Sequence, residues 1–324
     1  MKLSLIVPGY NEEVSLPLLF KAIQHALEHL PHNWEVIFVD DGSLDGSLAA
    51  LKAFALKDSA HVRVVVLRRN FGQTAAIAAG IDHALGEIIV LMDADMQNDP
   101  ADIPMLLGKL DEGYDLVSGW RKERKDNTIT RNLPSRMANG LISWVTGVHL
   151  HDYGCTLKVY RRDVLSSFRL YGEMHRFIPV FAHAAGARIA EVPVRHHPRK
   201  YGKTNYGLER TLKVLLDLFT VKFLLSYAAK PIYLFGGAGI GLMLISTLTL
   251  VTLMIRRVFF NISVLASPFF QMSVMFFILG FQSILMGLIA ELLVRTYYES
   301  QQKSTYTVRE VINGASSANK DRLS

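Results

Sequence analysis

The sequence contains little cysteine and little charge. Its 324 residues include one cysteine, Cys155, so no disulfide bond can form within the chain, which fits a reducing compartment. Charged residues make up 20% of the chain, whereas a typical soluble domain has about a quarter. Since half of the residues are apolar, this shortage of charge predicts a block of concentrated apolar sequence. The length predicts one large domain plus an appendage.

Two common signals are missing near the N-terminus. The apolar run of residues 3–7 ends at Pro8 and is too short for the hydrophobic region of a signal peptide. No G-x-G-x-x-G motif follows it, so a dinucleotide cofactor is not expected. The net charge of +6 suits nucleic acid, an anionic membrane or phosphorylated substrates, and by itself does not choose among them.

The apolar block lies in the C-terminal part of the chain. Residues 232–255 and 269–290 are uncharged, and each run can cross a hydrocarbon core of about 30 Å as a helix. We expect a transmembrane hairpin over residues 231–295, with Gly237 and Gly241 spaced for close helix packing. The alternative is a pair of buried helices in a soluble core.

The segment before the hairpin, residues 206–230, has apolar side chains recurring every three or four positions, as in Leu208, Leu212 and Leu215. This pattern predicts an amphipathic helix that lies in the membrane interface or packs on the globular domain. Residues 296–324 are assigned to a polar tail. Lysine and arginine flank both ends of the hairpin, which favours a cytosolic location for the tail and for the N-terminal domain.

Residues 1–205 alternate between apolar strand-like runs and helical stretches, which predicts an α/β domain with a mainly parallel sheet and helices on both faces. Polar segments follow three of the predicted strands: residues 8–12 (PGYNE), 40–43 (DDGS) and 93–97 (DADMQ). Because ligands bind beyond the carboxyl ends of parallel strands, we expect these segments to form one site.

The third segment has the ligands of a metal site. Asp93 and Asp95 alternate in an extended backbone, so their carboxylates can point the same way, and Gln97 adds an amide oxygen. Such hard oxygen ligands suit Mg²⁺ or Mn²⁺, and the ion would neutralise a departing nucleotide diphosphate. One aspartate of the second segment could accept a hydrogen bond from a nucleotide base.

In this order, the three motifs and the two late apolar runs resemble the family 2 glycosyltransferases of the GT-A fold that act on polyprenyl phosphates. This group includes dolichyl-phosphate mannose synthase. Residues 70–73 (NFGQ), 152–155 (DYGC) and 160–162 (YRR) are similar to the bacterial branch that transfers glucose or formamido-arabinose to undecaprenyl phosphate.

The resemblance implies roles for individual residues. Those implied to bind the nucleotide are Pro8, Tyr10, Asn11, Glu12, Asp40, Asp41, Asp93 and Ala94. Asp95, Arg121 and Arg199 would be catalytic. The acceptor phosphate would meet Arg121, Arg131, Arg136, Arg199 and Lys203. In the basic run at 199–205 the family usually ends on lysine, and this chain has Asn205.

The residues also support a phosphate acceptor directly. A phosphate monoester is largely dianionic at neutral pH, so it needs cations to hold it more than a base to activate it. Two basic runs, near 121–136 and 195–203, could supply them, because arginine binds phosphate through two hydrogen bonds.

These patterns predict a metal-dependent, inverting transfer of a sugar, from a UDP-sugar in preference to a GDP-sugar, to undecaprenyl phosphate or a related lipid. The enzyme would be a multi-pass protein of the inner membrane with its catalytic domain and both termini cytosolic. By resemblance it would form a homo-oligomer, a tetramer, and no nucleic-acid partner is expected. The alternatives are a processive polysaccharide synthase and an inert scaffold that partners a lipid-sugar flippase.

Overall fold

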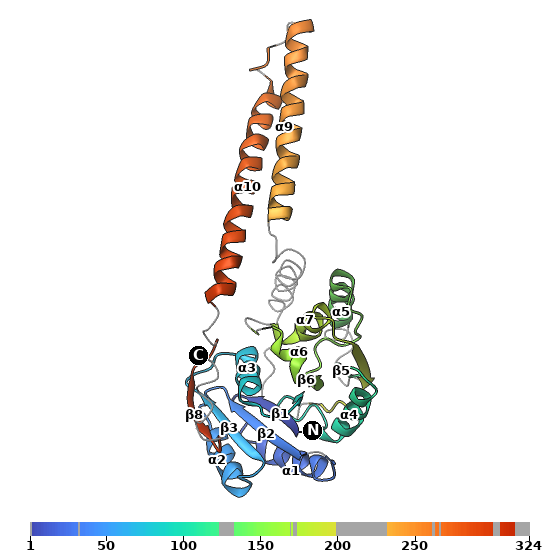
Figure 1. The fold of residues 1–324 in the computed structure, drawn as a ribbon, viewed down its shortest axis with the longest axis vertical. Helices are drawn as coiled ribbons and strands as arrows, with labels where there is room; N and C mark the ends of the chain where they lie inside the picture. Colours follow the sequence, from blue (N-terminus) through green and yellow to red (C-terminus); the bar gives the residue numbers. More distant parts are fainter. Residues whose placement is uncertain are drawn as a thin grey trace. The chain divides into compact units, whose positions relative to one another are not determined.

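The computed structural model describes residues 2–31, 33–122, 133–168, 170, 174–198, 232–260, 263–265, 267–300 and 305–314. The chain divides into two compact units (Figure 1). The first unit combines Met1–Asp217 with Ser304–Ser324, and the second is Leu218–Lys303. The predicted amphipathic helix over residues 206–230 lies outside the described residues.

The first unit is built on an eight-stranded sheet with the order β7-β5-β6-β4-β1-β2-β3-β8. The four strands from β4 to β3 in this order run parallel, while β6 is antiparallel to both of its neighbours, β4 and β5. This mostly parallel sheet confirms the predicted fold class. The strands are β1 (Lys2–Gly9), β2 (Asn33–Asp40), β3 (Val62–Leu67), β4 (Ile88–Leu91), β5 (Leu116–Trp120), β6 (Lys158–Arg161), β7 (Ile189–Pro193) and β8 (Val308–Ile312).

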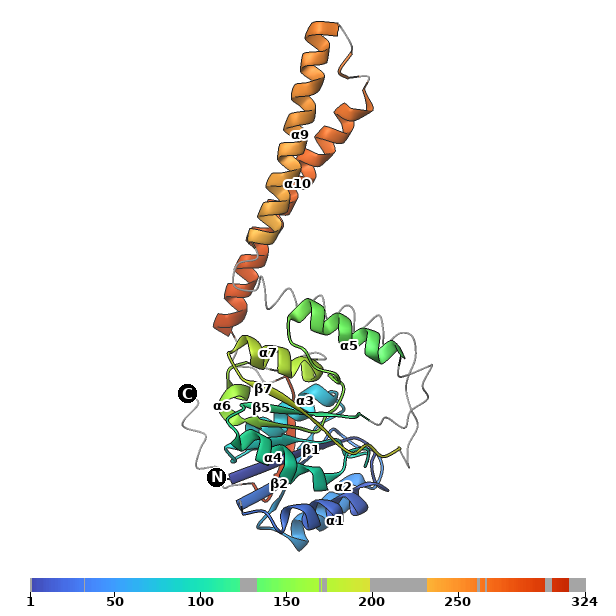
Figure 2. The same ribbon diagram turned by 90° about the vertical axis from the view of Figure 1, so that its right-hand side faces the viewer.

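Helices cover both faces of the sheet, as Figure 2 shows for α1 and α3. Along β1, Leu5 belongs to one hydrophobic cluster and Ile6 to another, because successive side chains of a strand point to opposite faces. The first cluster is closed by α1, α2 and α4, and the second by α3, α6 and α7. The bounds of the described helices in this unit are α1 (Leu16–Leu27), α2 (Ser47–Lys57), α3 (Gln73–His83), η1 (Pro100–Asp102), α4 (Ile103–Asp111), α5 (Leu133–Thr146), α6 (Arg162–Ser166), η3 (Met174–Phe177) and α7 (Ile178–Ala184).

The edge strand β8 comes from the segment expected to be a tail. It pairs antiparallel with β3, so the chain returns to the first unit after the two long helices of the second. The hydroxyl of Tyr306 donates to Asp82 at 2.7 Å, and Lys52 pairs with Glu310 at 2.8 Å. Part of the predicted tail is therefore an integral strand of the sheet.

The second unit consists of α9 (Ile232–Phe260) and α10 (Pro268–Ser300). Both helices are long and apolar enough to cross a membrane. Only 17% of the most apolar stretch of each helix is buried, which argues against a pair of core helices in a soluble protein. They approach closely at Gly239, where an added Cβ would lie 2.5 Å from the Gly280 carbonyl oxygen. A Cβ at the predicted packing residues Gly237 and Gly241 would have no described atom within 4 Å, so that prediction is wrong for this helix pair.

Candidate active site

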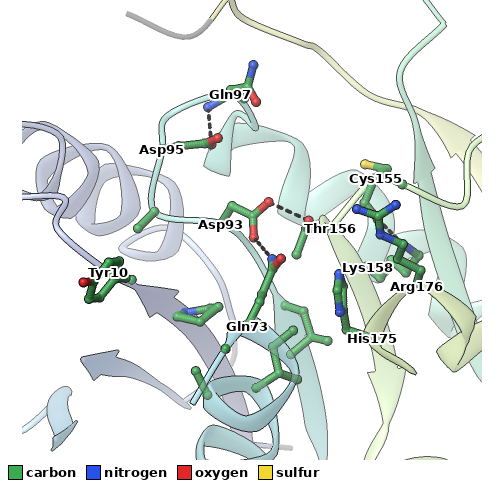
Figure 3. A pocket seen from close by; sticks show the side chains of 18 of the residues that line it. Tyr10, Gln73, Asp93, Asp95, Gln97, Cys155, Thr156, Lys158, His175 and Arg176 are labelled. Carbon is green, nitrogen blue, oxygen red and sulfur yellow. Dashed lines mark hydrogen bonds between the residues drawn. The ribbon is translucent and has the colours of Figure 1, made fainter. Parts of the chain in front are cut away.

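A cavity of about 390 Å³ lies at the carboxyl ends of β1, β2 and β4 (Figure 3). It brings together residues from all three polar segments, because parallel strands end at the same edge of the sheet. The predicted site residues that line it are Pro8, Tyr10, Glu12, Asp41, Asp93, Ala94, Asp95, Gln97 and Arg121.

Not every predicted site residue is among those that line the described cavity. Asn11 and Asp40 do not line the cavity. Arg131, Arg199 and Lys203 lie outside the described residues, as does the side chain of Arg136 in α5. The acceptor-phosphate set is therefore represented in the described cavity by Arg121.

Asn11 joins two of the loops that form the cavity. It has a positive φ of 56°, a conformation that asparagine tolerates better than most residues. Its backbone N–H donates to Ser43 Oγ at 3.0 Å, and its side-chain oxygen accepts from Leu44 N–H at 2.8 Å. Asn11 thus holds the loop after β1 against the loop after β2.

Asp41 holds a third loop in place. Its two carboxylate oxygens accept hydrogen bonds from the backbone N–H groups of Phe71, at 2.8 Å, and Gly72, at 2.9 Å. Burial raises the pKa of Asp41, and the two hydrogen bonds oppose this rise. The carboxylate positions the start of α3 and still has lone pairs for a ligand in the cavity.

Asp93 and Asp95 form the acidic centre of the cavity. Asp93 accepts from Gln73 Nε2 at 2.7 Å and from Thr156 Oγ1 at 2.6 Å, while Asp95 accepts from the backbone N–H of Gln97 at 3.1 Å. Burial, together with the nearby charge of Asp95, raises the pKa of Asp93 to about 6. A cation beside the two carboxylates would remove this unfavourable interaction.

The acidic pair fits a magnesium or manganese ion that takes its remaining ligands from a substrate. The described residues contain no group of three or more His, Cys, Asp or Glu side chains that could hold a metal. Mg²⁺ is commonly bound through one or two carboxylates, with water and substrate phosphates completing the shell. Gln97, the third predicted ligand, also lines the cavity.

Arg121, which follows β5, is held by Asp152. The guanidinium donates to the two carboxylate oxygens from Nε at 2.6 Å and from Nη2 at 2.9 Å. Burial alone would lower the pKa of Arg121, but hydrogen bonding and the charge of Asp152 outweigh it and raise the pKa. The Asp152 backbone N–H donates to Glu191 at 3.0 Å, which fixes the pair to β7. Arg121 stays charged and oriented.

The cavity also contains polar residues that were not predicted: Gln73, Thr156, Lys158, Tyr160, His175 and Arg176. Burial lowers the pKa of Lys158, and it lowers the pKa of His175 to about 3, so His175 is neutral at physiological pH. Its Nδ1 lies 2.8 Å from Thr74 Oγ1. One signal was visible in the sequence: Thr156, Lys158 and Tyr160 alternate with apolar residues, which points them to one face of a strand.

The fold is that of an α/β protein, and its cavity contains an acidic pair of the kind that binds a divalent cation. The chain belongs to glycosyl transferase family 2, whose sequence profile matches residues 4–169, and it is a glycosyltransferase. This confirms the resemblance drawn from the motifs.

Relatives match nearly the whole chain. The dodecaprenyl-phosphate galacturonate synthase of Rhizobium johnstonii is 42% identical over 98% of this chain and 95% of its own length. The undecaprenyl-phosphate 4-deoxy-4-formamido-L-arabinose transferase of Enterobacter sp. is 36% identical over 97% and 95%. Among solved structures, glucosyl-3-phosphoglycerate synthase from Mycobacterium tuberculosis, in complex with Mn²⁺ and UDP-glucose, shares the fold with a TM-score of 0.52 and 20% identity, over 69% of this chain and 78% of its own.

Proposed function

We propose that this enzyme transfers a sugar from a UDP-sugar to the phosphate of a polyprenyl phosphate, with inversion at the anomeric carbon. The observation that carries the proposal is the Asp93 and Asp95 pair in a cavity of a chain that also has two membrane-length apolar helices. Relatives named for polyprenyl-phosphate sugar transfer match it over nearly their full length, including these helices.

The described residues divide the work within the cavity. Pro8, Tyr10 and Asp41 line the end suited to the nucleotide base. Asp93 and Asp95, with Gln97, would hold Mg²⁺ or Mn²⁺, which neutralises charge on the departing diphosphate. Arg121 has five N–H donors and uses two on Asp152, so others remain to hold the acceptor phosphate.

Direct attack by the acceptor needs no strong general base. The second pKa of a phosphate monoester is near 6, so the acceptor oxygen is already ionised at neutral pH. The enzyme's task is then to align this oxygen with the anomeric carbon and to stabilise the leaving group. Displacement from the face opposite the leaving diphosphate inverts the configuration.

The strand β8 supports a membrane topology with both flanks of the hairpin on one side. β8 follows α10 in sequence, yet it pairs in the same sheet as β1–β7, which precede α9. If both helices span the membrane, these strands must lie on the same side. Lysine and arginine near the flanks favour the cytosol, where nucleotide sugars are available. Assembly into a homo-oligomer stays a prediction.

The two alternatives have less support. Processive synthases of the family carry a Gln-x-x-Arg-Trp motif, and none of Trp34, Trp120 and Trp144 follows an arginine. An inert scaffold would have no reason to retain Asp93 hydrogen-bonded to Gln73 and Thr156 in an open cavity.

Transfer can be tested on the purified full-length protein in detergent, with radiolabelled UDP-sugars, undecaprenyl phosphate and Mg²⁺ or Mn²⁺. We expect labelled lipid to form, EDTA to abolish it, and Asp95→Asn to lower the rate by about 100-fold or more. The control Asp111→Asn changes an exposed carboxylate at the end of α4 and should leave the rate unchanged. Transfer that survives both EDTA and Asp95→Asn would refute the metal assignment.

A further inference from the structure

Two cationic residues of the cavity, Lys158 and Arg176, have no role in the mechanism above. Lys158 comes from β6, a central strand between β4 and β5, and the residue is 3% exposed. It faces the cavity, whereas its neighbours Leu157 and Val159 belong to a hydrophobic cluster on the opposite face. Lysine is almost never fully buried unless it is paired, so a ligand that pairs with it is the simplest reason for its position.

Lys158 has carbonyl partners and no described carboxylate partner. Its ammonium group donates to the carbonyl oxygens of Tyr153 and Cys155, which uses two of its three N–H donors. Among the described residues, no carboxylate oxygen lies within 4.0 Å of it. Asp93 and Asp152 act on this ammonium group electrostatically, without a direct contact among the described residues. A buried charge is costly without a directly bonded opposite charge, so an anion bound beside Lys158 would stabilise it.

Two further donors line the same cavity. The hydroxyl of Tyr160 is buried and has no hydrogen-bond partner among the described residues. The half-buried Arg176, from η3, adds a guanidinium group. His175 beside it is neutral and is held near Thr74, so it adds no positive charge to this end of the cavity. An ammonium, a guanidinium and a hydroxyl together suit an anion with two oxygens.

The position of this cationic end indicates which part of the substrate reaches it. In Figure 3, Lys158, His175 and Arg176 lie on the far side of Asp93 from Tyr10. With the nucleotide base near Tyr10 and the diphosphate near Asp93, the next group along a nucleotide sugar is the sugar itself.

We propose that Lys158, Arg176 and the Tyr160 hydroxyl bind a carboxylate on the transferred sugar, so that the preferred donor is a nucleotide-linked uronic acid. This inference rests on the proposed function. A sugar with an uncharged hydroxymethyl group at the same carbon would leave the buried ammonium without its counter-charge, and the site would discriminate against it.

The test compares donors that differ only in this group: UDP-glucuronate with UDP-glucose, and UDP-galacturonate with UDP-galactose. The full-length protein in detergent, with undecaprenyl phosphate and Mg²⁺, should transfer one of the uronates with a kcat/KM about 10- to 100-fold above that of its neutral partner. Tyr160→Phe and Arg176→Gln should each reduce this ratio, mainly through the uronate donor.

The matched control is Arg161→Gln. Arg161 follows Tyr160 in β6 but does not line the cavity, and its Nε lies 3.8 Å from Asp115 Oδ1. The ratio of uronate to neutral donor should therefore stay as in the wild type. Thermal unfolding of each variant checks that the ratio is measured on folded protein. Lys158→Met, which removes the charge and keeps the length, should equalise the two donors if it folds.

Each result has one meaning. Neutral donors used as well as uronates by the wild type would overturn the inference while leaving the proposed function intact. Variants that slow both donors equally and raise the KM for undecaprenyl phosphate would show that the cations hold the acceptor phosphate instead. If no donor yields a lipid-linked sugar, the proposed function itself fails.

Discussion

Replacing Asp152 by asparagine removes the charge from a buried ion pair and keeps the shape of the side chain. Arg121 and Asp152 are joined at 2.6 Å, with side chains only 13% and 4% exposed. The substitution leaves a buried guanidinium without its counter-charge, which costs about 3–5 kcal/mol. For a domain of this size, we expect Tm to fall by roughly 10 °C. Transfer activity should fall with it, because Arg121 loses its fixed orientation.

The assay is thermal unfolding of the full-length protein in detergent, followed by tryptophan fluorescence. Trp120 is a local reporter, because it precedes Arg121 and stacks on His151 with ring centroids 4.2 Å apart. The control is Glu112→Gln, which breaks an exposed pair with Lys109, of 57% and 34% exposure, and should cost less than about 1 kcal/mol.

A double variant separates the loss of pairing from the loss of packing. Arg121→Met combined with Asp152→Asn removes both charges, so its Tm should lie above that of Asp152→Asn alone, although activity stays low. An Asp152→Asn protein that unfolds within about 1 °C of the wild type would refute this account of the pair, as would a double variant that is less stable than the sum of the single effects.

Three further predictions concern stability. Burial lowers the pKa of His175 to about 3 from its ordinary 6.5. The neutral imidazole therefore favours the folded state fully above pH 6.5, and the free energy of unfolding falls by about 1.4 kcal/mol per pH unit as the pH drops from 6.5 toward 3. His175→Gln should therefore flatten the decline of Tm between pH 7 and pH 5, and an unchanged slope would contradict the burial. Gly80→Ala should destabilise the protein, since the new Cβ would lie 2.3 Å from a methyl group of β1. Gly108 lies in α4 with open space around it, so Gly108→Ala should stabilise the protein by about 0.5–1 kcal/mol. Equal Tm shifts for the two variants would count against this reasoning. Tyr306→Phe removes the 2.7 Å hydrogen bond to Asp82 and should cost about 1 kcal/mol by thermal unfolding, and no loss would show that β8 is held by other contacts.

Local patterns in the sequence were sufficient for the main features of the fold. Apolar runs separated by helical stretches predicted the parallel sheet, because a strand buried on both faces must be apolar throughout. The two uncharged runs predicted the long helices α9 and α10 by length alone. The convergence of residues 8–12, 40–43 and 93–97 also followed, since parallel strands share the edge at which they end.

Features that depend on distant pairing were not predictable from these patterns. β8 contacts β3 only because the chain returns to the sheet after both long helices. Its sequence, V-R-E-V-I, does not alternate between apolar and polar residues and gives no sign of the strand with which it pairs. The reversed direction of β6 likewise depends on its pairing with β4 and β5.

In the site, the sequence by itself determined which residues have the right chemistry, and the tertiary structure decided how they are held and charged. The spacing of Asp93 and Asp95 indicated a metal site, but their partners Gln73 and Thr156 lie on other elements. Lys158 was not singled out from the sequence, because what distinguishes it is its burial in the folded protein. Hydrogen bonding and desolvation depend on atoms that are near in space and far apart in the chain, so only the folded protein sets them.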